Sequence, residues 1–208
     1  MTAGNAFYWL VKILFWPFGR GWLGMTVRGS LPRRGALLLV ANHVSLLDPA
    51  VLGSACPRPV RFLIKERLYN FRSQGWFYRG MRAIPVRVEG RADHFALRAA
   101  LRALRAGEVL CIFPEGAGLD PAGGLRPPRS GAALIAAHSG VPIVPVGITG
   151  THASLPKGRK WPRRGRIVVT FGEPFVLSRE AAGREGRQLG AEEIMRRIEE
   201  LLPPRGGS

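Results

Sequence analysis

Two side chains that could do chemistry together, His43 and Asp48, stand five residues apart in the chain. They follow an almost wholly apolar run, residues 36–41, which predicts a buried strand of an α/β sheet. Asp48 and Pro49 then open a predicted helix, since proline is tolerated in the first helical turn. Ligands of open α/β sheets bind beyond the carboxyl ends of the strands. An imidazole at that place can accept a proton near pH 7, and a nearby carboxylate can orient it and stabilise its charged form.

A structural role for the same residues is the alternative. Ser45 and Asp48 have the spacing of a capping box, and Asp48 followed by Pro49 is also typical of a helix N-cap. Either role would explain Asp48 without catalysis. Asn42, directly before His43, would fix the loop, or its backbone or side chain would help to bind an oxyanion; the sequence leaves both open.

Four short blocks occur in an order that resembles one family. Residues 42–48 carry the string Asn-His-x-Ser-x-x-Asp, and residues 113–116 carry Phe-Pro-Glu-Gly. Two weaker blocks are residues 62–68, a strand that ends in a lysine, and residues 141–146. Together they make the chain resemble the glycerolipid acyltransferases of the lysophosphatidic acid acyltransferase type, over roughly residues 25 to 175.

The resemblance implies transfer of a fatty acyl group, in phospholipid biosynthesis, from an acyl thioester to the free hydroxyl of lysophosphatidic acid. The donor and co-substrate would be acyl-CoA or acyl-carrier protein. His43 would be the general base and Asp48 would orient it; because a thiol is a good leaving group, no enzyme nucleophile, metal or other cofactor is expected. The residues expected to bind substrate are Asn42, Lys65, Arg87, Phe113, Pro114, Glu115, Gly116 and Arg126.

One block departs from the family pattern. The family continues the Phe-Pro-Glu-Gly string with Thr-Arg, and its arginine is linked to phosphate binding, whereas this chain has Ala117 and Gly118. Arg126 and Arg129, in the loop that follows, could supply the missing charge. Glycerol 3-phosphate or another lysolipid therefore remains an alternative acceptor.

Two further cations are expected near His43. Lys65 and Arg87 each directly follow an apolar run, residues 60–64 and residues 83–86. If both runs form strands parallel to residues 36–41, their side chains emerge at the edge that carries His43. Arginine suits a phosphate because its planar fork can donate two hydrogen bonds at once.

The charge of the chain indicates an anionic partner. The chain has 31 Lys and Arg residues against 14 Asp and Glu, a net charge of +17. A membrane surface, a phosphorylated or CoA-like substrate, or nucleic acid would fit this charge, so a non-enzymatic basic binding protein is a further alternative. No nucleic-acid-binding motif is recognisable, so no nucleic acid is expected. Cys56 and Cys111 do not make a disulfide framework, which fits a reducing, cytosolic setting.

The N-terminus is predicted to attach the protein to a membrane. Residues 6–18 are apolar except for Lys12, and three tryptophans lie in or near this run. Thirteen helical residues span roughly 20 Å, whereas a membrane crossing needs about 20 residues. We therefore expect residues 1–24 to be a helical anchor in one leaflet, on the cytoplasmic face of the cell membrane, peripheral or monotopic. The alternative is a helix packed on the core of the domain.

The remaining residues, 25–208, are predicted to form one α/β domain, the acyltransferase domain, with a mainly parallel mixed sheet flanked by helices. The hydrophobic fraction of 46% is too high for a disordered chain. Residues 66–80 are rich in aromatic side chains, which would pack in the core or wall an acyl-chain tunnel. The expected strands are residues 25–29, 36–41, 60–64, 83–86, 108–113, 143–147 and 166–171. The expected helices are residues 92–106, 129–139 and 188–202, besides the helix that begins at Asp48.

Overall fold

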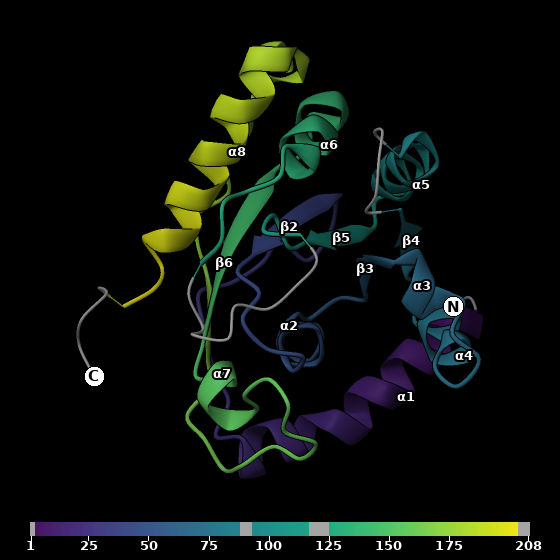
Figure 1. Cartoon of the computed structure of the whole chain (residues 1–208), viewed down its shortest axis with the longest axis vertical. Coiled ribbons are helices and arrows are strands. Elements are labelled where there is room, and N and C mark those ends of the chain that lie inside the picture. The colour runs from purple at the N-terminus through teal and green to yellow at the C-terminus, as the bar shows by residue number, and fades with distance from the viewer. Residues whose placement is uncertain (1–2, 88–92, 117–124, 204–208) are drawn as a thin grey trace.

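The computed structural model describes residues 3–87, 93–116 and 125–203, and its described strands form one seven-stranded sheet (Figure 1). The strands are β1 Thr26–Arg28, β2 Leu37–Ala41, β3 Val60–Lys65, β4 Ile84–Val86, β5 Val109–Ile112, β6 Ile143–Thr149 and β7 Val168–Phe171. The helices are α1 Ala3–Pro17, α2 Asp48–Ala55, α3 Glu66–Tyr69, α4 Gly75–Gly80, α5 His94–Arg105, α6 Gly131–Ser139, α7 Thr151–Ser154 and α8 Arg184–Glu199. A π-helical turn, η1 Phe18–Trp22, follows α1, and a 3₁₀ turn, η2 Arg179–Ala182, precedes α8.

The sheet is mixed and mostly parallel, as the sequence predicts. Its strand order is β1-β7-β6-β2-β5-β3-β4. Strands β2, β3, β4, β5 and β6 run in one direction, whereas β7 pairs antiparallel with β6 and β1 pairs parallel with β7. The carboxyl ends of β2, β3, β4, β5 and β6 therefore lie at one edge of the sheet. This edge is called the carboxyl edge below.

The central strand β2 is buried on both faces, which explains its unbroken apolar sequence. Leu37, Leu39 and Ala41 belong to the core that includes residues of α2. Leu38 and Val40 belong to a second core, formed with α5, α6 and α8. Figure 1 shows the same arrangement, with α2 and α1 on one side of the sheet and α5, α6 and α8 on the other.

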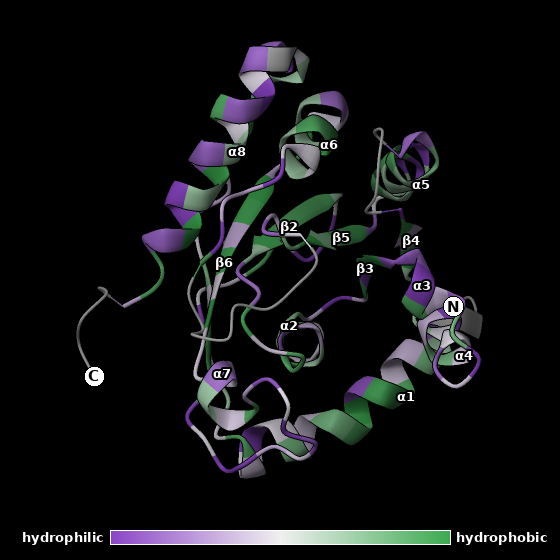
Figure 2. Cartoon of the chain, viewed as in Figure 1, coloured by the Kyte–Doolittle hydropathy of each residue, from purple (hydrophilic) through white to green (hydrophobic). Residues whose placement is uncertain are grey.

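Helix α1 has one side against the domain and one side open. Tyr8 is 3% exposed, and its hydroxyl donates to the Gly53 carbonyl of α2 at 2.8 Å. Leu10 is 54% exposed, and Ile13 and Leu14, one helical turn further along, are 65% and 69% exposed. Figure 2 shows the apolar colour along most of α1. The contact of Tyr8 agrees with a helix packed on the domain, whereas the membrane attachment stays a prediction, for which the exposed apolar side is available.

No helix in the described ranges is both long and apolar enough to span a bilayer. The predicted aromatic segment forms α3 and α4. The ring of Phe7 on α1 contacts Trp76 and Phe77 of α4 edge to face, with centroids 6.1 and 6.0 Å apart. These rings of α4 thus contact α1 at the surface of the domain. Trp76 is 60% exposed and Phe71 is 52% exposed, so the expected packing of these two side chains in the core is wrong, and the acyl-chain tunnel stays a prediction.

Candidate active site

The structure brings His43 and Asp48 together at the carboxyl edge, in the turn between β2 and α2. The imidazole Nδ1 and the Asp48 Oδ2 are 2.9 Å apart, and the two side chains are 17% and 0% exposed. Because a carboxylate only accepts hydrogen bonds, Nδ1 carries the proton, which leaves Nε2 as the ring nitrogen that can act as a base.

The same carboxylate also organises the turn. Asp48 Oδ2 accepts hydrogen bonds from the backbone N–H groups of Val44 and Ser45, at 2.7 and 2.8 Å. The bond from Ser45 N–H is the backbone half of a capping box. The reciprocal bond to the Ser45 hydroxyl is not made, because the Asp48 N–H donates to the Ser45 backbone carbonyl at 3.2 Å, while the hydroxyl itself donates to the Leu155 carbonyl at 2.9 Å. Asp48 therefore binds both the imidazole and the backbone of the turn before α2. The N-cap of α2 is Leu47, without a side-chain cap bond, so the interpretation of Asp48 as the helix N-cap is wrong.

Asn42 joins the turn to the neighbouring strand. Its side-chain N–H donates to the Ile148 carbonyl at 2.8 Å, and its side-chain oxygen accepts from the Ile148 N–H at 2.7 Å. The residue is 2% exposed. Of the two roles expected for Asn42, this geometry favours fixing the loop.

Glu115 binds the backbone of the turn that carries His43. Its buried carboxylate accepts from the His43 backbone N–H at 2.8 Å through Oε1 and from the Arg126 backbone N–H at 3.0 Å through Oε2. Burial raises the pKa of the Glu115 carboxyl, and these two N–H donors oppose the rise. A contact with the acceptor, which the sequence predicts for Glu115, remains a prediction beside this positioning role.

The neighbours of Glu115 shape the floor of the site. The Phe113 ring stacks on the His43 imidazole, with centroids 4.3 Å apart and 22° between the planes. Pro114 is buried, and its carbonyl accepts from the Arg129 N–H at 2.8 Å. Gly116 has a φ of +75°, and a Cβ there would lie 2.6 Å from the Arg129 Nε, so a larger residue would be strained.

The predicted cations lie at the same edge as His43. Because β3 and β4 are parallel to β2, Lys65 ends β3 and Arg87 follows β4 at the carboxyl edge, as expected. Lys65 is exposed and, within the described ranges, forms no ion pair. Arg87 Nε lies 3.1 Å from Glu66 Oε2, and both side chains are largely exposed. Such a surface pair is worth about 0–1 kcal/mol, so a phosphate could displace it.

One histidine near the site was not predicted from the sequence. The Nδ1 of His152, on α7, lies 3.4 Å from the Val44 carbonyl oxygen, in the turn that carries His43. The signal that could have found it is a polar Thr-His pair just after the strand of residues 143–147. Ala117 and Gly118, which depart from the family pattern, lie outside the described residues.

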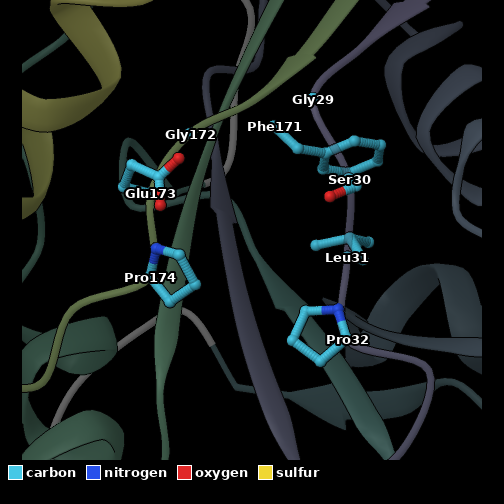
Figure 3. A pocket seen from close by; sticks show the side chains of 8 residues that line it. All are labelled: Gly29, Ser30, Leu31, Pro32, Phe171, Gly172, Glu173 and Pro174. Atoms are coloured by element: carbon cyan, nitrogen blue, oxygen red, sulfur yellow. The ribbon is translucent and has the colours of Figure 1, made fainter.

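A surface pocket lies away from these residues (Figure 3). It is formed by residues 29–32, which follow β1, and residues 171–174, at the end of β7. Because β1 and β7 run opposite to β2, their carboxyl ends lie at the other edge of the sheet. The pocket is therefore no part of the site around His43.

The fold and the site together define an α/β protein with an imidazole–carboxylate pair at the carboxyl edge of a mostly parallel sheet. Comparison with known protein families identifies the family. The profile of the Acyltransferase family matches residues 24–149, more than half of the chain. The chain belongs to the Acyltransferase family, as the four sequence blocks indicated.

Individual relatives agree with this assignment. The chain is similar to PlsC of Thermotoga maritima, a 1-acyl-sn-glycerophosphate acyltransferase, with a TM-score of 0.72 and 28% identity over 99% of this chain and 81% of that one. A 1-acyl-sn-glycerol-3-phosphate acyltransferase of Bacillus subtilis is 25% identical over 88% of this chain and 89% of its own length. A lyso-ornithine lipid O-acyltransferase of Rhizobium meliloti is 31% identical over 89% of this chain and 74% of its own. The chain spans only 41% of the length of a chloroplastic relative from Brassica napus, to which it is 32% identical.

Proposed function

We propose that this protein transfers a fatty acyl group from acyl-CoA or acyl-carrier protein to the free hydroxyl of lysophosphatidic acid. The observation that carries the proposal is the 2.9 Å contact of His43 Nδ1 with buried Asp48, which makes Nε2 the basic nitrogen of a partly exposed ring. The names of the Bacillus and Thermotoga relatives support this acceptor. The family assignment favours an enzyme over a non-enzymatic binding protein.

The proposed reaction needs only one base. His43 Nε2 takes the proton of the acceptor hydroxyl while the hydroxyl oxygen attacks the thioester carbon. The carbon–sulfur bond then breaks, and the thiolate leaves and receives the proton from the imidazolium. Asp48 holds the ring and stabilises its charged form, and the stacked Phe113 keeps the ring plane in place.

A second acceptor is a specific alternative. The Rhizobium relative is named for a lyso-ornithine lipid. The present chain also lacks the Thr-Arg of the family block, where it has Ala117 and Gly118. Both observations favour testing an acceptor that carries no phosphate.

The deciding experiment offers labelled acyl-CoA and labelled acyl-carrier protein, separately, with lysophosphatidic acid, glycerol 3-phosphate and lyso-ornithine lipid. We expect the highest kcat/KM with lysophosphatidic acid. A higher value with lyso-ornithine lipid would replace the proposed acceptor, and no acyl product with any pair would reject acyl transfer to these acceptors.

We expect Lys65→Ala and Arg87→Ala to raise the KM for lysophosphatidic acid far more than the KM for the acyl donor. Loss of one charge-assisted contact costs about 1.5–3 kcal/mol, which corresponds to roughly 10- to 150-fold in affinity. Arg126→Ala should have the same effect only if its side chain replaces the arginine missing at Gly118. Steady-state kinetics with each substrate varied in turn measure this.

The control for these variants is Arg105→Ala, which removes an exposed cation from the last turn of α5. It should leave both KM values unchanged. Equal losses with phosphorylated and phosphate-free acceptors would reject a phosphate site at Lys65 and Arg87.

We further propose that α1 attaches the protein to the cytoplasmic face of a membrane through its open side. Changing Leu10, Ile13 and Leu14 together to serine should release the protein from phospholipid vesicles in a flotation assay. Each of these exposed apolar side chains would contribute about 1 kcal/mol on insertion, so binding should weaken by roughly 100-fold.

The control is the melting temperature of the triple variant, which should equal that of the parent because the three side chains face solvent. Deleting residues 1–24 is a poorer test, since it also removes Tyr8 and Leu23, which are 3% and 0% exposed. Unchanged flotation of the triple variant would mean that α1 does not attach the protein.

A further inference from the structure

The loop that joins α7 to β7 carries dense positive charge. It comprises residues 155–166 and is called the basic loop below. Its exposed cations are Lys157, Arg159, Lys160, Arg163, Arg164 and Arg166. The chain has no Asp or Glu from residue 151 to residue 172. Across the described ranges, none of these cations forms an ion pair, so the charge of the loop is not neutralised locally.

The basic loop also presents a tryptophan to solvent. Trp161 is 79% exposed, the highest value among the large hydrophobic side chains that the structure describes. Hydrogen bonds hold the loop around it: Arg159 Nε donates to the Trp161 carbonyl at 3.1 Å, and the Arg163 N–H donates to the Ser154 carbonyl at 2.9 Å. A tryptophan among cations is the composition that favours the interface between lipid headgroups and acyl chains.

The basic loop lies beside the end of the N-terminal helix. The Arg164 guanidinium lies 5.8 Å from the centre of the Trp22 ring in η1. The backbones also touch, since a Cβ on Gly24 would lie only 2.5 Å from the Gly165 carbonyl oxygen. In Figure 1 the loop that follows α7 and the end of α1 lie together at the lower margin of the molecule. The basic loop therefore lies next to the C-terminal end of the N-terminal helix.

We propose that the basic loop is a second membrane-docking element, which binds the anionic headgroups of a lipid bilayer next to α1. The inference rests on the proposed attachment of α1 and adds the part of the surface that selects anionic lipid. Each Lys or Arg close to an anionic membrane surface adds to the attraction, so several on one short loop have a large combined effect.

Helix α1 and the basic loop would make different kinds of contact with a membrane, one apolar and one charged. Lys12 of α1 donates to the Cys56 carbonyl inside the domain, and burial lowers the pKa of its amine. Arg20 lies over the Trp16 ring, 5.3 Å from its centre. The helix thus offers an apolar stripe with little free charge, whereas the basic loop supplies the charge that the stripe lacks.

The first residue of the basic loop, Leu155, is hydrogen-bonded to the turn that carries His43. The Ser45 hydroxyl donates to the Leu155 carbonyl, and His152, just before the loop, lies at the Val44 carbonyl. A bilayer bound by the loop would therefore lie close to the turn that carries His43. This placement suits an acceptor that resides in the membrane.

The test compares two triple variants of equal charge change in the full chain. Lys157→Gln, Lys160→Gln and Arg163→Gln alter the basic loop, and Arg98→Gln, Arg102→Gln and Arg105→Gln alter the exposed face of α5. Flotation is measured with phosphatidylcholine vesicles that contain or lack phosphatidylglycerol, at low and high salt. We expect the loop variant to bind the anionic vesicles about 10- to 100-fold more weakly at low salt, and the α5 variant to bind as the parent does.

Further outcomes separate this inference from the proposed function. Turnover of a water-soluble short-chain acyl thioester and acceptor should be unchanged in the loop variant, since the altered side chains do not contact His43. Absence of turnover in the parent chain would reject the proposed function and leave the flotation result standing. Trp161→Ala should weaken binding several-fold at low and high salt alike.

Three results would overturn the inference. One is equal loss in the loop and α5 variants, which would mean that net charge alone matters. A second is full anionic-vesicle binding by the loop variant. The third is tighter binding of the parent chain to an RNA oligomer than to the vesicles, lost specifically in the loop variant.

Discussion

Replacing His43 with alanine should lower acyl transfer by about 100- to 10,000-fold, the contribution of a general base, while the chain still folds. The expected loss follows from the geometry of the ring. Its Nδ1 is engaged with Asp48 at 2.9 Å, so Nε2 is the nitrogen that can remove the proton of the acceptor. Product formation is measured beside a melting curve, because the alanine variant also loses the stack on Phe113.

A neighbouring histidine provides the control for this result. His152 lies at the same turn but contacts the Val44 carbonyl, and its ring makes no ion pair with Asp48. His152→Ala should therefore keep turnover within tenfold of the parent. Activity of His43→Ala within tenfold of the parent would remove His43 from the role of base.

Asp48→Asn should be comparably severe, with a loss of roughly 10⁴-fold by analogy with an exchanged carboxylate behind a catalytic histidine. The neutral amide can no longer stabilise the imidazolium that forms when the base takes a proton. The substitution is a sharp test because asparagine has nearly the same size and shape as aspartate and lacks only the charge. Asp48 Oδ1 has no hydrogen-bond partner in the described part of the chain, so the amide nitrogen can take its place without breaking a bond there.

The two roles of Asp48 give different results in this variant. If the contact with His43 dominates, turnover falls and the melting temperature changes by only a few degrees. A lower melting temperature with near-normal turnover would mean that the main role of the carboxylate is structural, through its bonds to the Val44 and Ser45 N–H groups. In the double variant with His43→Ala, the losses should be far from additive, since base and carboxylate act as one unit.

The alternation of strands and helices was readable from the sequence because it rests on local patterns. The apolar run before His43 forms β2, buried on both faces, and the helix expected after it begins at Asp48. The pairing of His43 with Asp48 was also accessible, since both lie on one short turn. The place of Lys65 and Arg87 followed from the rule that parallel strands end at the same edge.

The partners of Asn42 and Glu115 were decided only by the tertiary structure. Asn42 bonds to a strand 106 residues further along the chain, and Glu115 bonds to the backbone of a residue 72 positions before it. Their residue types indicated polar roles at the site, but the pairing of β2 with β6 and β5 determines which backbone groups they reach.

The N-terminal helix shows the same division between sequence and structure. Its apolar sequence alone is compatible with a bilayer or with a core, because both bury hydrocarbon. Packing against α2 and α4 decides which side is buried, as at Tyr8, and leaves Ile13 and Leu14 in solvent. The position of the basic loop beside η1 depends on backbone contacts between segments some 140 residues apart, such as Gly24 and Gly165. Contacts of this kind arise from the packing of the sheet and leave no local pattern in the sequence.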